Sequence, residues 1–233
     1  PVYSPMLARA LPAGKSIQDY AEPEGTWRGR VPRPEWMLEE KHDGHRLILI
    51  IDDDSISAHS RGGKPRALPK HIIRSCKRLP NGVYDGELLV PGGTSTDVKA
   101  IENIDKLELQ LFDILKTNDT DVMSKPGFER RALLEKAGSL LADNSSVKVT
   151  KQYSVSEDTL NLIWNAGGEG AIIKNVNTQY VEGQRTKGWI KFKKLAAAEL
   201  TVTGFESGKN GPHSTICLKD DFGKECKVKT RNS

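Results

Sequence analysis

Residues 36–46 of this chain read Trp36-Met37-Leu38-Glu39-Glu40-Lys41-His42-Asp43-Gly44-His45-Arg46, and the apolar run of residues 47–51 follows them. Two strand-like segments therefore flank a turn that contains a glycine, and this pattern predicts a β-hairpin. Side chains alternate along a strand, so we expect Lys41 and Asp43 on one face. A lysine held in this way can act as a nucleophile once its proton is removed. Lys-x-Asp-Gly alone is weak evidence, because chance produces it in roughly one chain in twenty of this length, and a solvated lysine on an exposed turn explains it equally well.

The composition restricts the class of protein. The chain has 233 residues, with 35 Lys and Arg against 31 Asp and Glu, which is enough for one large domain or a large and a small one. Its three cysteines are an odd number without metal-site spacing, which favours a reducing compartment and argues against a disulfide framework or a zinc site. No apolar stretch is long enough to span a membrane, and the N-terminus lacks signal-peptide organisation. We therefore expect a soluble, cytoplasmic monomer.

Two segments of the chain are strongly basic. Residues 55–84 and 183–198 contain no Asp or Glu, and both are rich in Lys and Arg. A charge run usually forms a solvated face, but two such blocks in a nearly balanced chain favour a surface for polyphosphate or nucleic acid. The candidate nucleic-acid contacts in the first block are Lys64, Arg66 and Lys70.

The hydrophobic pattern predicts an α+β domain at residues 1–196 and the start of a small all-β module at residues 197–233. In the first domain the predicted strands are 36–41, 46–51, 56–60, 83–90, 107–115, 147–152, 170–174 and 188–193. The predicted helices are 68–79, 127–141 and one that Ser156 caps and that ends at Gly167. Residues 94–105 are expected to be a flexible polar excursion. The strands after residue 199 are too few for a closed oligonucleotide-binding barrel.

Polar residues stand inside or at the ends of several predicted strands, where they are least expected. These positions are Lys41, Asp43, Arg46, Ser60, Arg61, Asp85, Glu87, Asp113, Glu169, Lys174, Lys191 and Lys193, and the aromatic residues Phe112 and Trp189 belong to the same short segments. Each one has an ordinary explanation on its own, such as a solvated strand face or a core phenylalanine. Together they are typical of nucleotidyl transfer, in which a lysine amine attacks the α-phosphorus of a nucleotide.

This chemistry needs a neutral amine, whereas a free lysine has a pKa of about 10.4. Partial burial and the neighbouring cations of Arg46, Lys191 and Lys193 favour the neutral form. The same cations can offset phosphate charge, together with a metal held by Glu169.

Other residues in or beside these segments can hold the nucleoside. Glu87 and Arg61 can bind the ribose hydroxyls, Phe112 can stack on the base, and Glu39 can accept a hydrogen bond from an adenine amino group.

In their order along the chain, these segments resemble the motifs of the covalent nucleotidyltransferases and, within them, the ATP-dependent DNA ligases of compact phage- or bacterium-like type. The resemblance extends from Pro5 to about Asp220. The matching segments are Lys41 to Arg46, Ser60-Arg61, Asp85-Gly86-Glu87, Leu111-Phe112-Asp113, Glu169 to Lys174 and Trp189 to Lys193.

The resemblance implies that Lys41 accepts AMP, with Asp43 and Arg46 as its motif partners. It also implies a ribose or metal role for Glu87, adenine stacking for Phe112, a metal role for Glu169, and phosphate-side contacts for Lys174, Lys191 and Lys193. The implied fold is an ATP-grasp-like adenylation domain followed by a partial OB-fold barrel, and the implied cofactors are ATP and Mg²⁺. The implied substrate is nicked duplex DNA, which is sealed through a lysyl-AMP and a DNA-adenylate.

Two departures and three alternatives accompany this prediction. The family's last motif, a basic segment in the barrel, has no counterpart before Ser233, and there is no room for a large N-terminal DNA-binding region, so we expect a compact or truncated ligase.

An RNA ligase is the first alternative, although Arg46 and the lysine spacing after Trp189 favour DNA. An mRNA-capping guanylyltransferase is the second, although its fourth motif usually begins with Asp-Gly rather than Glu169-Gly170. A non-catalytic nucleic-acid-binding module would leave the acidic positions without a role.

Overall fold

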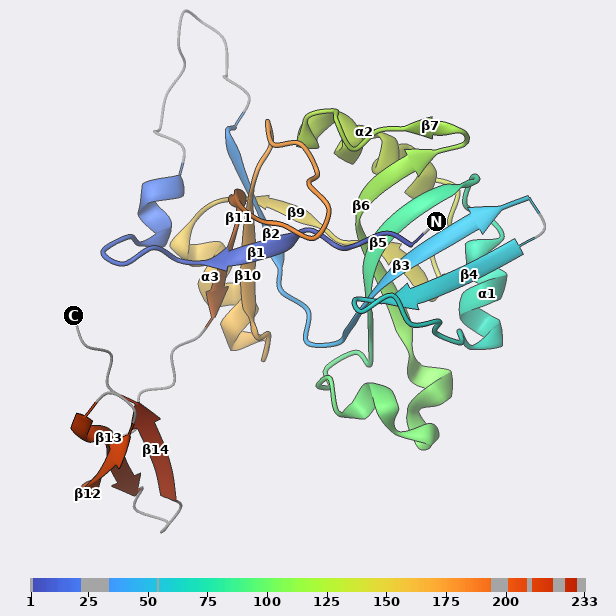
Figure 1. Cartoon of the computed structure of the whole chain (residues 1–233). Helices are drawn as coiled ribbons and strands as arrows, with labels where there is room; N and C mark the ends of the chain where they lie inside the picture. The colour runs from blue at the N-terminus through green and yellow to red at the C-terminus, as the bar shows by residue number, and fades with distance from the viewer. Residues whose placement is uncertain are drawn as a thin grey trace, which may run out of the picture. The chain divides into compact units, whose positions relative to one another are not determined.

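Two β-sheets form the framework of the larger part of the chain (Figure 1). The computed structural model describes residues 2–21, 34–53, 55–193, 201–208, 211–219 and 225–229. The chain divides into two compact units, Pro1–Lys194 and Leu195–Ser233. The predicted boundary at residues 196–197 lies outside the described residues. Among the described helices, none is both long and apolar enough to cross a membrane.

The first sheet of the larger unit has six strands. They are β3 (His45–Asp52), β4 (Ser55–Ser60), β5 (Gly82–Leu89), β6 (Glu108–Thr117), β7 (Thr120–Asp121) and β8 (Val147–Val149). Their order is β4-β3-β5-β6-β7, with β8 also paired to β6. Helices α1 (Lys70–Cys76) and α2 (Gly127–Gly138) bury Ile72 and Leu134 against one face of this sheet, in a core cluster that includes Leu47 and Leu109.

The second sheet has five strands in the order β1-β11-β10-β2-β9. They are β1 (Leu7–Ala10), β2 (Trp36–Glu40), β9 (Gln152–Ser154), β10 (Gly170–Asn175) and β11 (Arg185–Lys193). Helix α3 (Glu157–Asn165) packs on its outer face, where Leu160 meets Leu38, Ile173 and Phe192. Ser156 caps this helix by accepting a hydrogen bond from the Thr159 amide at 3.1 Å, as its sequence position predicts.

A third cluster of buried residues lies between the two sheets and includes Met6, Ile48, Leu115, Tyr180 and Trp189. The period of two along a strand explains this layering, since odd and even residues of β3 and β11 enter different clusters. The same alternation sends polar side chains of both sheets inward at one end, where a pocket opens.

The predicted hairpin at residues 36–51 is wrong. Strand β2 pairs with β10 and β9, and β3 pairs with β4 and β5, so the two strands belong to different sheets. Residues 41–44 are the link that crosses from one sheet to the other. An apolar pattern identifies each strand but not its partner, and here the partners lie far away in the sequence. The link needs a glycine because a Cβ at Gly44 would overlap the Leu88 carbonyl oxygen.

Other predicted elements differ in extent. Helix α1 is shorter than the predicted 68–79. The predicted excursion at 94–105 contains the 3₁₀ helices η2 (Asp97–Lys99) and η3 (Ile101–Lys106), and a further one, η1 (Ile17–Tyr20), lies near the N-terminus. The single strand predicted at 147–152 is two strands, β8 and β9, which join different sheets.

The described part of the smaller unit is a three-stranded antiparallel sheet in the order β12-β13-β14. Its strands are β12 (Thr201–Gly208), β13 (Gly211–Lys219) and β14 (Glu225–Lys229). Over these residues the sheet is open rather than a closed barrel, and its assignment to the start of an OB fold stays a prediction.

Gly170 is the residue at which β10 starts, and it generates a stability prediction. Its φ is +152°, and a Cβ there would overlap the Phe192 carbonyl oxygen of the neighbouring strand. We expect Gly170→Ala to lower the free energy of unfolding by at least about 2 kcal/mol. Gly62→Ala is the matched control, because nothing lies within 4 Å of a Cβ at that position. Urea denaturation of both variants checks this, and equal midpoints would contradict it.

Candidate functional site

The pairing register places polar side chains in rows across the inner face of the five-stranded sheet. The central row, across β9, β2, β10 and β11, is Gln152, Glu39, Ile172 and Lys191. The row on one side contains Lys174 and Trp189, and the row on the other contains Gly170 and Lys193. Residues far apart in the sequence thus become neighbours because their strands pair.

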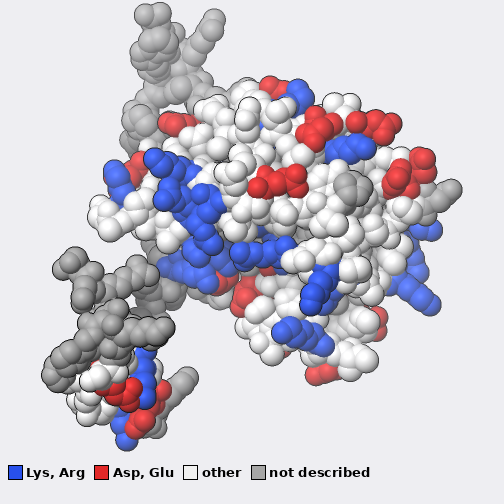
Figure 2. All heavy atoms as spheres, in the orientation of Figure 1, with Lys and Arg blue, Asp and Glu red and all other residues white. Residues whose placement is uncertain are grey.

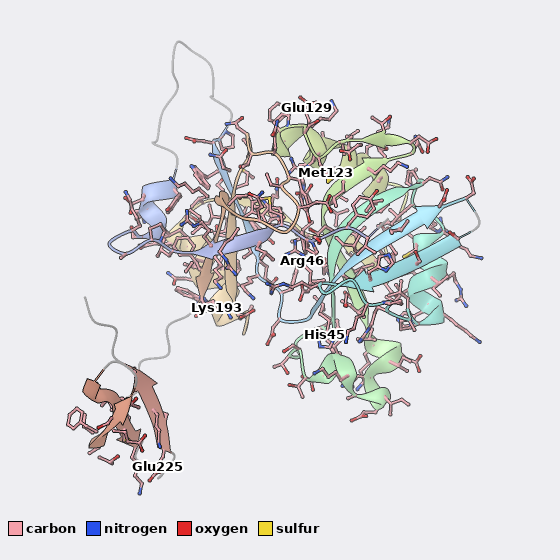
Figure 3. The ribbon with its side chains drawn as sticks, in the orientation of Figure 1. His45, Arg46, Met123, Glu129, Lys193 and Glu225 are labelled. Atoms are coloured by element: carbon pink, nitrogen blue, oxygen red, sulfur yellow. The ribbon has the colours of Figure 1, made fainter. Side chains whose placement is uncertain are left out.

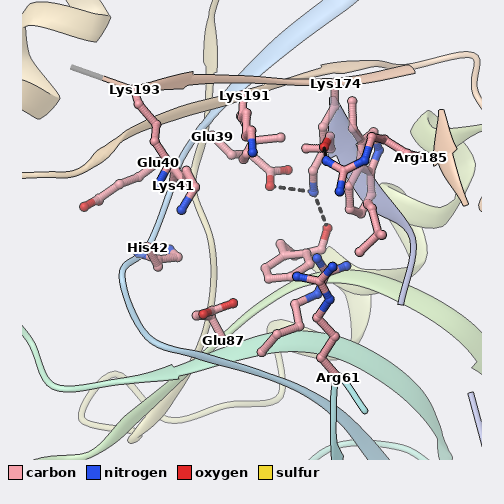
Figure 4. A pocket seen from close by; sticks show the side chains of 16 residues that line it. Glu39, Glu40, Lys41, His42, Arg61, Glu87, Lys174, Arg185, Lys191 and Lys193 are labelled. Carbon is pink, nitrogen blue, oxygen red and sulfur yellow. Dashed lines mark hydrogen bonds and ion pairs between the residues drawn. The ribbon is translucent and has the colours of Figure 1, made fainter. Parts of the chain in front are cut away.

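A pocket of about 300 Å³ opens between the two sheets (Figure 4). The six-stranded sheet contributes Arg46, Glu87 and Phe112, and the turn after β4 contributes Arg61. Figure 2 shows that Lys and Arg side chains gather over β1 and β11 on the face of the larger unit that is turned toward the viewer. The pocket is therefore suited to an anionic ligand with a flat apolar part.

Lys41 lies directly after β2, and its backbone N–H donates to the Gly170 carbonyl at 2.8 Å. Its ammonium group pairs with Glu169, whose other carboxylate oxygen pairs with Lys193. Partial burial raises the pKa of Glu169, but hydrogen bonds and charge from Lys193 and Lys41 outweigh this and hold that pKa below its ordinary value. Without a ligand, the lysine is therefore kept in place by an ion pair at the pocket edge.

Glu39 is only 2% exposed and forms the floor of the pocket near Lys174. Lys174 Nζ lies 2.6 Å from Glu39 Oε2 and donates to the Phe112 carbonyl oxygen at 3.0 Å (Figure 4). Lys174, for which the sequence predicts a phosphate-side contact, is thus placed beside the glutamate and the phenylalanine that are expected to hold the base.

Phe112 and Trp189 form the aromatic wall of the pocket. Their ring centroids are 6.2 Å apart in an edge-to-face arrangement. The Lys174 ammonium lies 4.7 Å from the Phe112 centroid and 4.4 Å from the Trp189 centroid, within cation–π range. Ile172, which like Trp189 belongs to the sheet opposite Phe112, also lines the pocket, so a flat ring has an aromatic and an aliphatic surface available.

Arg46 lies between the two sheets (Figure 3) and is fixed by a buried network. Its Nε and NH2 donate to the two oxygens of Asp85 at 2.7 and 2.6 Å, and NH2 also donates to the Met6 carbonyl. Tyr180 donates to Asp85 at 2.6 Å and accepts from the Met6 N–H at 2.9 Å. Burial lowers the pKa of Arg46, but the charge and hydrogen bonds of Asp85 outweigh this and raise it above its ordinary value.

Glu87 stands on the wall opposite Lys41. Burial raises the pKa of Glu87 to about 7, against the opposing charges of Arg46 and Lys41. A divalent cation nearby would favour the ionised form.

The donor set at the pocket edge fits a magnesium ion that is shared with phosphates. The described residues contain no group of three or more metal-ligating side chains. Mg²⁺ usually takes one or two carboxylates, several waters and substrate phosphate oxygens. Glu169 and Glu87 supply carboxylates of that kind.

The structure brings most of the predicted site residues together. Those lining the pocket are Glu39, Lys41, Arg46, Arg61, Glu87, Phe112, Lys174, Lys191 and Lys193. Glu169 reaches it through its ion pairs. Asp43 is not among the lining residues, because the strand that would have carried it inward ends at Glu40.

The predicted nucleic-acid contacts lie outside this pocket. Lys64 and Lys70 are exposed. Arg66 lines an adjacent hollow of about 390 Å³, which shares Arg46, Arg61 and Glu87 with the pocket.

The sequence predicted no site role for several lining residues, among them His42, Arg185 and Trp189. Trp189 shares the alternation of Lys191 and Lys193, so this pattern could have revealed it. Arg185 lies in the basic segment 183–198, which predicts an anion surface, but nothing in the sequence assigns it a site role of its own. Burial lowers the pKa of His42, which therefore favours the neutral form, and its Nε2 lies 3.3 Å from Thr150 Oγ1.

Known proteins share much of this sequence. The family model described as "ATP dependent DNA ligase domain" matches residues 5–193.

The chain belongs to the ATP-dependent DNA ligase domain family.

The curated relatives of this ligase-family chain include the protein named DNA ligase 2 of Methanosarcina acetivorans, which is 29% identical over 224 residues, covering 82% of this chain and 39% of the relative. The DNA ligase of Archaeoglobus fulgidus is 31% identical over 222 residues, with the same coverage of 82% and 39%. This chain therefore spans about two fifths of the length of these relatives.

Solved structures share the fold. The ligase domain of Mycobacterium tuberculosis LigD has a TM-score of 0.62 at 19% identity, covering 99% of this chain and 74% of that one. A Lig E DNA ligase has a TM-score of 0.66 at 19% identity, covering 99% and 85%. The α+β ligase fold predicted from the sequence is confirmed by this likeness.

The network under Arg46 generates a prediction about stability. Asp85→Asn keeps the shape of the side chain but leaves the Arg46 charge without its buried partner, so we expect the free energy of unfolding to fall by about 3–5 kcal/mol. Tyr180→Phe removes one hydroxyl from the same network and should cost about 1–2 kcal/mol. Urea denaturation measures both. A loss for Asp85→Asn no larger than that for Tyr180→Phe would contradict the role of the ion pair.

Proposed function

We propose that this chain carries the nucleotidyl-transfer site of an ATP-dependent DNA ligase that seals nicks in duplex DNA. The observation that carries the proposal is Lys41 at the edge of a cation-lined pocket that also offers an aromatic wall and a buried carboxylate. Membership of the ligase family supports the same reaction.

In the first step, the Lys41 ammonium group would lose a proton to solvent, and the resulting amine would attack the α-phosphorus of ATP. A P–N bond would form while the P–O bond to the leaving pyrophosphate breaks. Lys191 and Lys193 would offset the charge that develops on the α-phosphate, because fixed cations in a partly dry site need no reorganisation. Phosphates entering the pocket would compete with Glu169 for Lys41 and Lys193. Breaking those ion pairs would free the Lys41 side chain for deprotonation and leave the carboxylate free for a cation.

Glu169 and Glu87 would hold Mg²⁺ together with phosphate oxygens. When bound, the ion would supply charge neutralisation for the phosphates. Phe112 and Ile172 would enclose the adenine, Glu39 would accept from its amino group, and Arg46, Arg61 and Glu87 would lie near the ribose and phosphates.

In the later steps, AMP would pass from Lys41 to a 5′-phosphate at the nick, and the 3′-hydroxyl would attack that phosphate and release AMP. Lys64, Arg66 and Lys70 are proposed to contact phosphates of the DNA. A guanylyltransferase is an outcome of the test below, since it would form its adduct from GTP. The family match favours neither this alternative nor an RNA ligase, which would also use ATP.

Incubation with α-labelled ATP or GTP and Mg²⁺, followed by denaturing electrophoresis and peptide mapping, tests the proposal. We expect a covalent adduct from ATP that maps to Lys41 and is absent from Lys41→Ala, because only this lysine follows β2 at the pocket edge. The exposed Lys136→Ala is the matched control and should label normally. Label retained by Lys41→Ala, or mapped to another lysine, would overturn the assignment.

The proposed DNA contacts generate a second prediction. If Lys64, Arg66 and Lys70 neutralise phosphates, affinity for nicked duplex should fall steeply with salt through counterion release. Replacing each by Gln should flatten the slope of log K against log salt by up to about one unit for each phosphate that is no longer neutralised. Fluorescence anisotropy over a salt series measures this. If none of the three replacements changes the slope, these residues do not contact DNA phosphates, and the basic segment is an ordinary solvated face.

A further inference from the structure

The Glu39 carboxylate is held by side chains that the proposed chemistry does not use. Glu39 pairs across the sheet with Gln152 of β9. Gln152 Nε2 donates to Glu39 Oε1 at 2.8 Å, while Lys174 Nζ lies 2.6 Å from Oε2. Both oxygens of the buried carboxylate therefore have a donor before any nucleotide arrives.

Arg131 of α2 also lies close to the Glu39 carboxylate. Its NH1 lies 3.6 Å from Glu39 Oε1 and is buried without a hydrogen-bond partner. The guanidinium is held from its other side by Glu135, which accepts from Arg131 Nε at 2.8 Å. Gln152 and Arg131 line a second hollow of about 220 Å³, which shares Phe112, Lys174 and Trp189 with the nucleotide pocket.

Neither Gln152 nor Arg131 lines the nucleotide pocket itself. They contact a residue that does, and their donors determine what that residue can offer to a ligand. A carboxylate surrounded by N–H donors presents only acceptor lone pairs. Such a group can accept a hydrogen bond from the 6-amino group of a purine. The 6-oxo group of another purine is itself an acceptor, so it forms no hydrogen bond with the carboxylate, and buried polar atoms are left unpaired.

We propose that Gln152 and Arg131 are positioning residues that hold Glu39 as an acceptor and thereby make the pocket select 6-aminopurine nucleotides over 6-oxopurine nucleotides. This inference rests on the proposed function, because it assumes that the base of ATP lies at Glu39. It adds the residues that set the selectivity.

The test compares kcat/KM for adduct formation with α-labelled ATP and α-labelled GTP. In Gln152→Ala the carboxylate loses one donor and its orientation, so the ATP-over-GTP ratio should fall at least about ten-fold, as expected for a hydrogen bond to a charged group. Gln152→Glu should lower it further, because two carboxyl groups at hydrogen-bond distance share a proton and can then donate to a 6-oxo group. Gln110→Ala, a half-buried glutamine of β6, is the matched control and should leave the ratio unchanged.

Arg131→Gln gives an independent measurement from a different element, so the inference stays testable if Gln152→Ala does not fold, which thermal unfolding reveals. Equal losses with ATP and GTP in both the Gln152 and Arg131 variants would show a merely structural role and overturn the inference, while the proposed function would stand. No adduct from either nucleotide in the unmodified chain would overturn the proposed function, and this inference with it.

Discussion

Charge that is buried between two sheets must be paired, and this constraint organises the inner faces of the larger unit. Asp85 is fully buried and receives hydrogen bonds from Arg46 and Tyr180. Glu39 is nearly as buried and is held by Gln152 and Lys174. An unpaired charge at either position would cost several kcal/mol. These pairs, each formed on the inner face of one sheet, therefore determine which side chains can stand at the pocket and in what orientation.

The pairs differ in how readily a ligand can exchange them. The Arg46–Asp85 pair lies in the interior and also ties down the backbone of Met6, so it is part of the scaffold. The Glu169 pairs with Lys41 and Lys193 are at the open edge, where the Lys193 side chain is 50% exposed. Phosphate groups and a divalent cation can replace such partners one for one. A pocket whose interior ion pairs are fixed and whose ion pairs at the open edge can be exchanged is suited to binding a nucleotide and then transferring part of it.

Strand register is what turns separate sequence motifs into one site. Gln152, Glu39 and Ile172 come from three strands, yet pairing places them side by side. The link at residues 41–44 then carries the chain from this sheet to the other, so that Lys41 stands at the junction while Arg46 enters the second sheet. One segment of the sequence thus contributes to both walls of the pocket.

Local patterns in the sequence were enough to predict the strand alternation, the ligase-like motifs and most of the pocket-lining residues. Lys191 and Lys193 share a face and Phe192 is buried, because a period of two is a local property of the chain. Three features follow from the way the chain folds in space: β2 and β3 pair in different sheets, Asp43 is not among the pocket-lining residues, and Lys174 meets Glu39. The sequence also did not reveal Gln152 and Arg131 behind Glu39. These features depend on which distant strands and helices meet, and pairing partners that are far apart in the chain leave no trace in a local pattern.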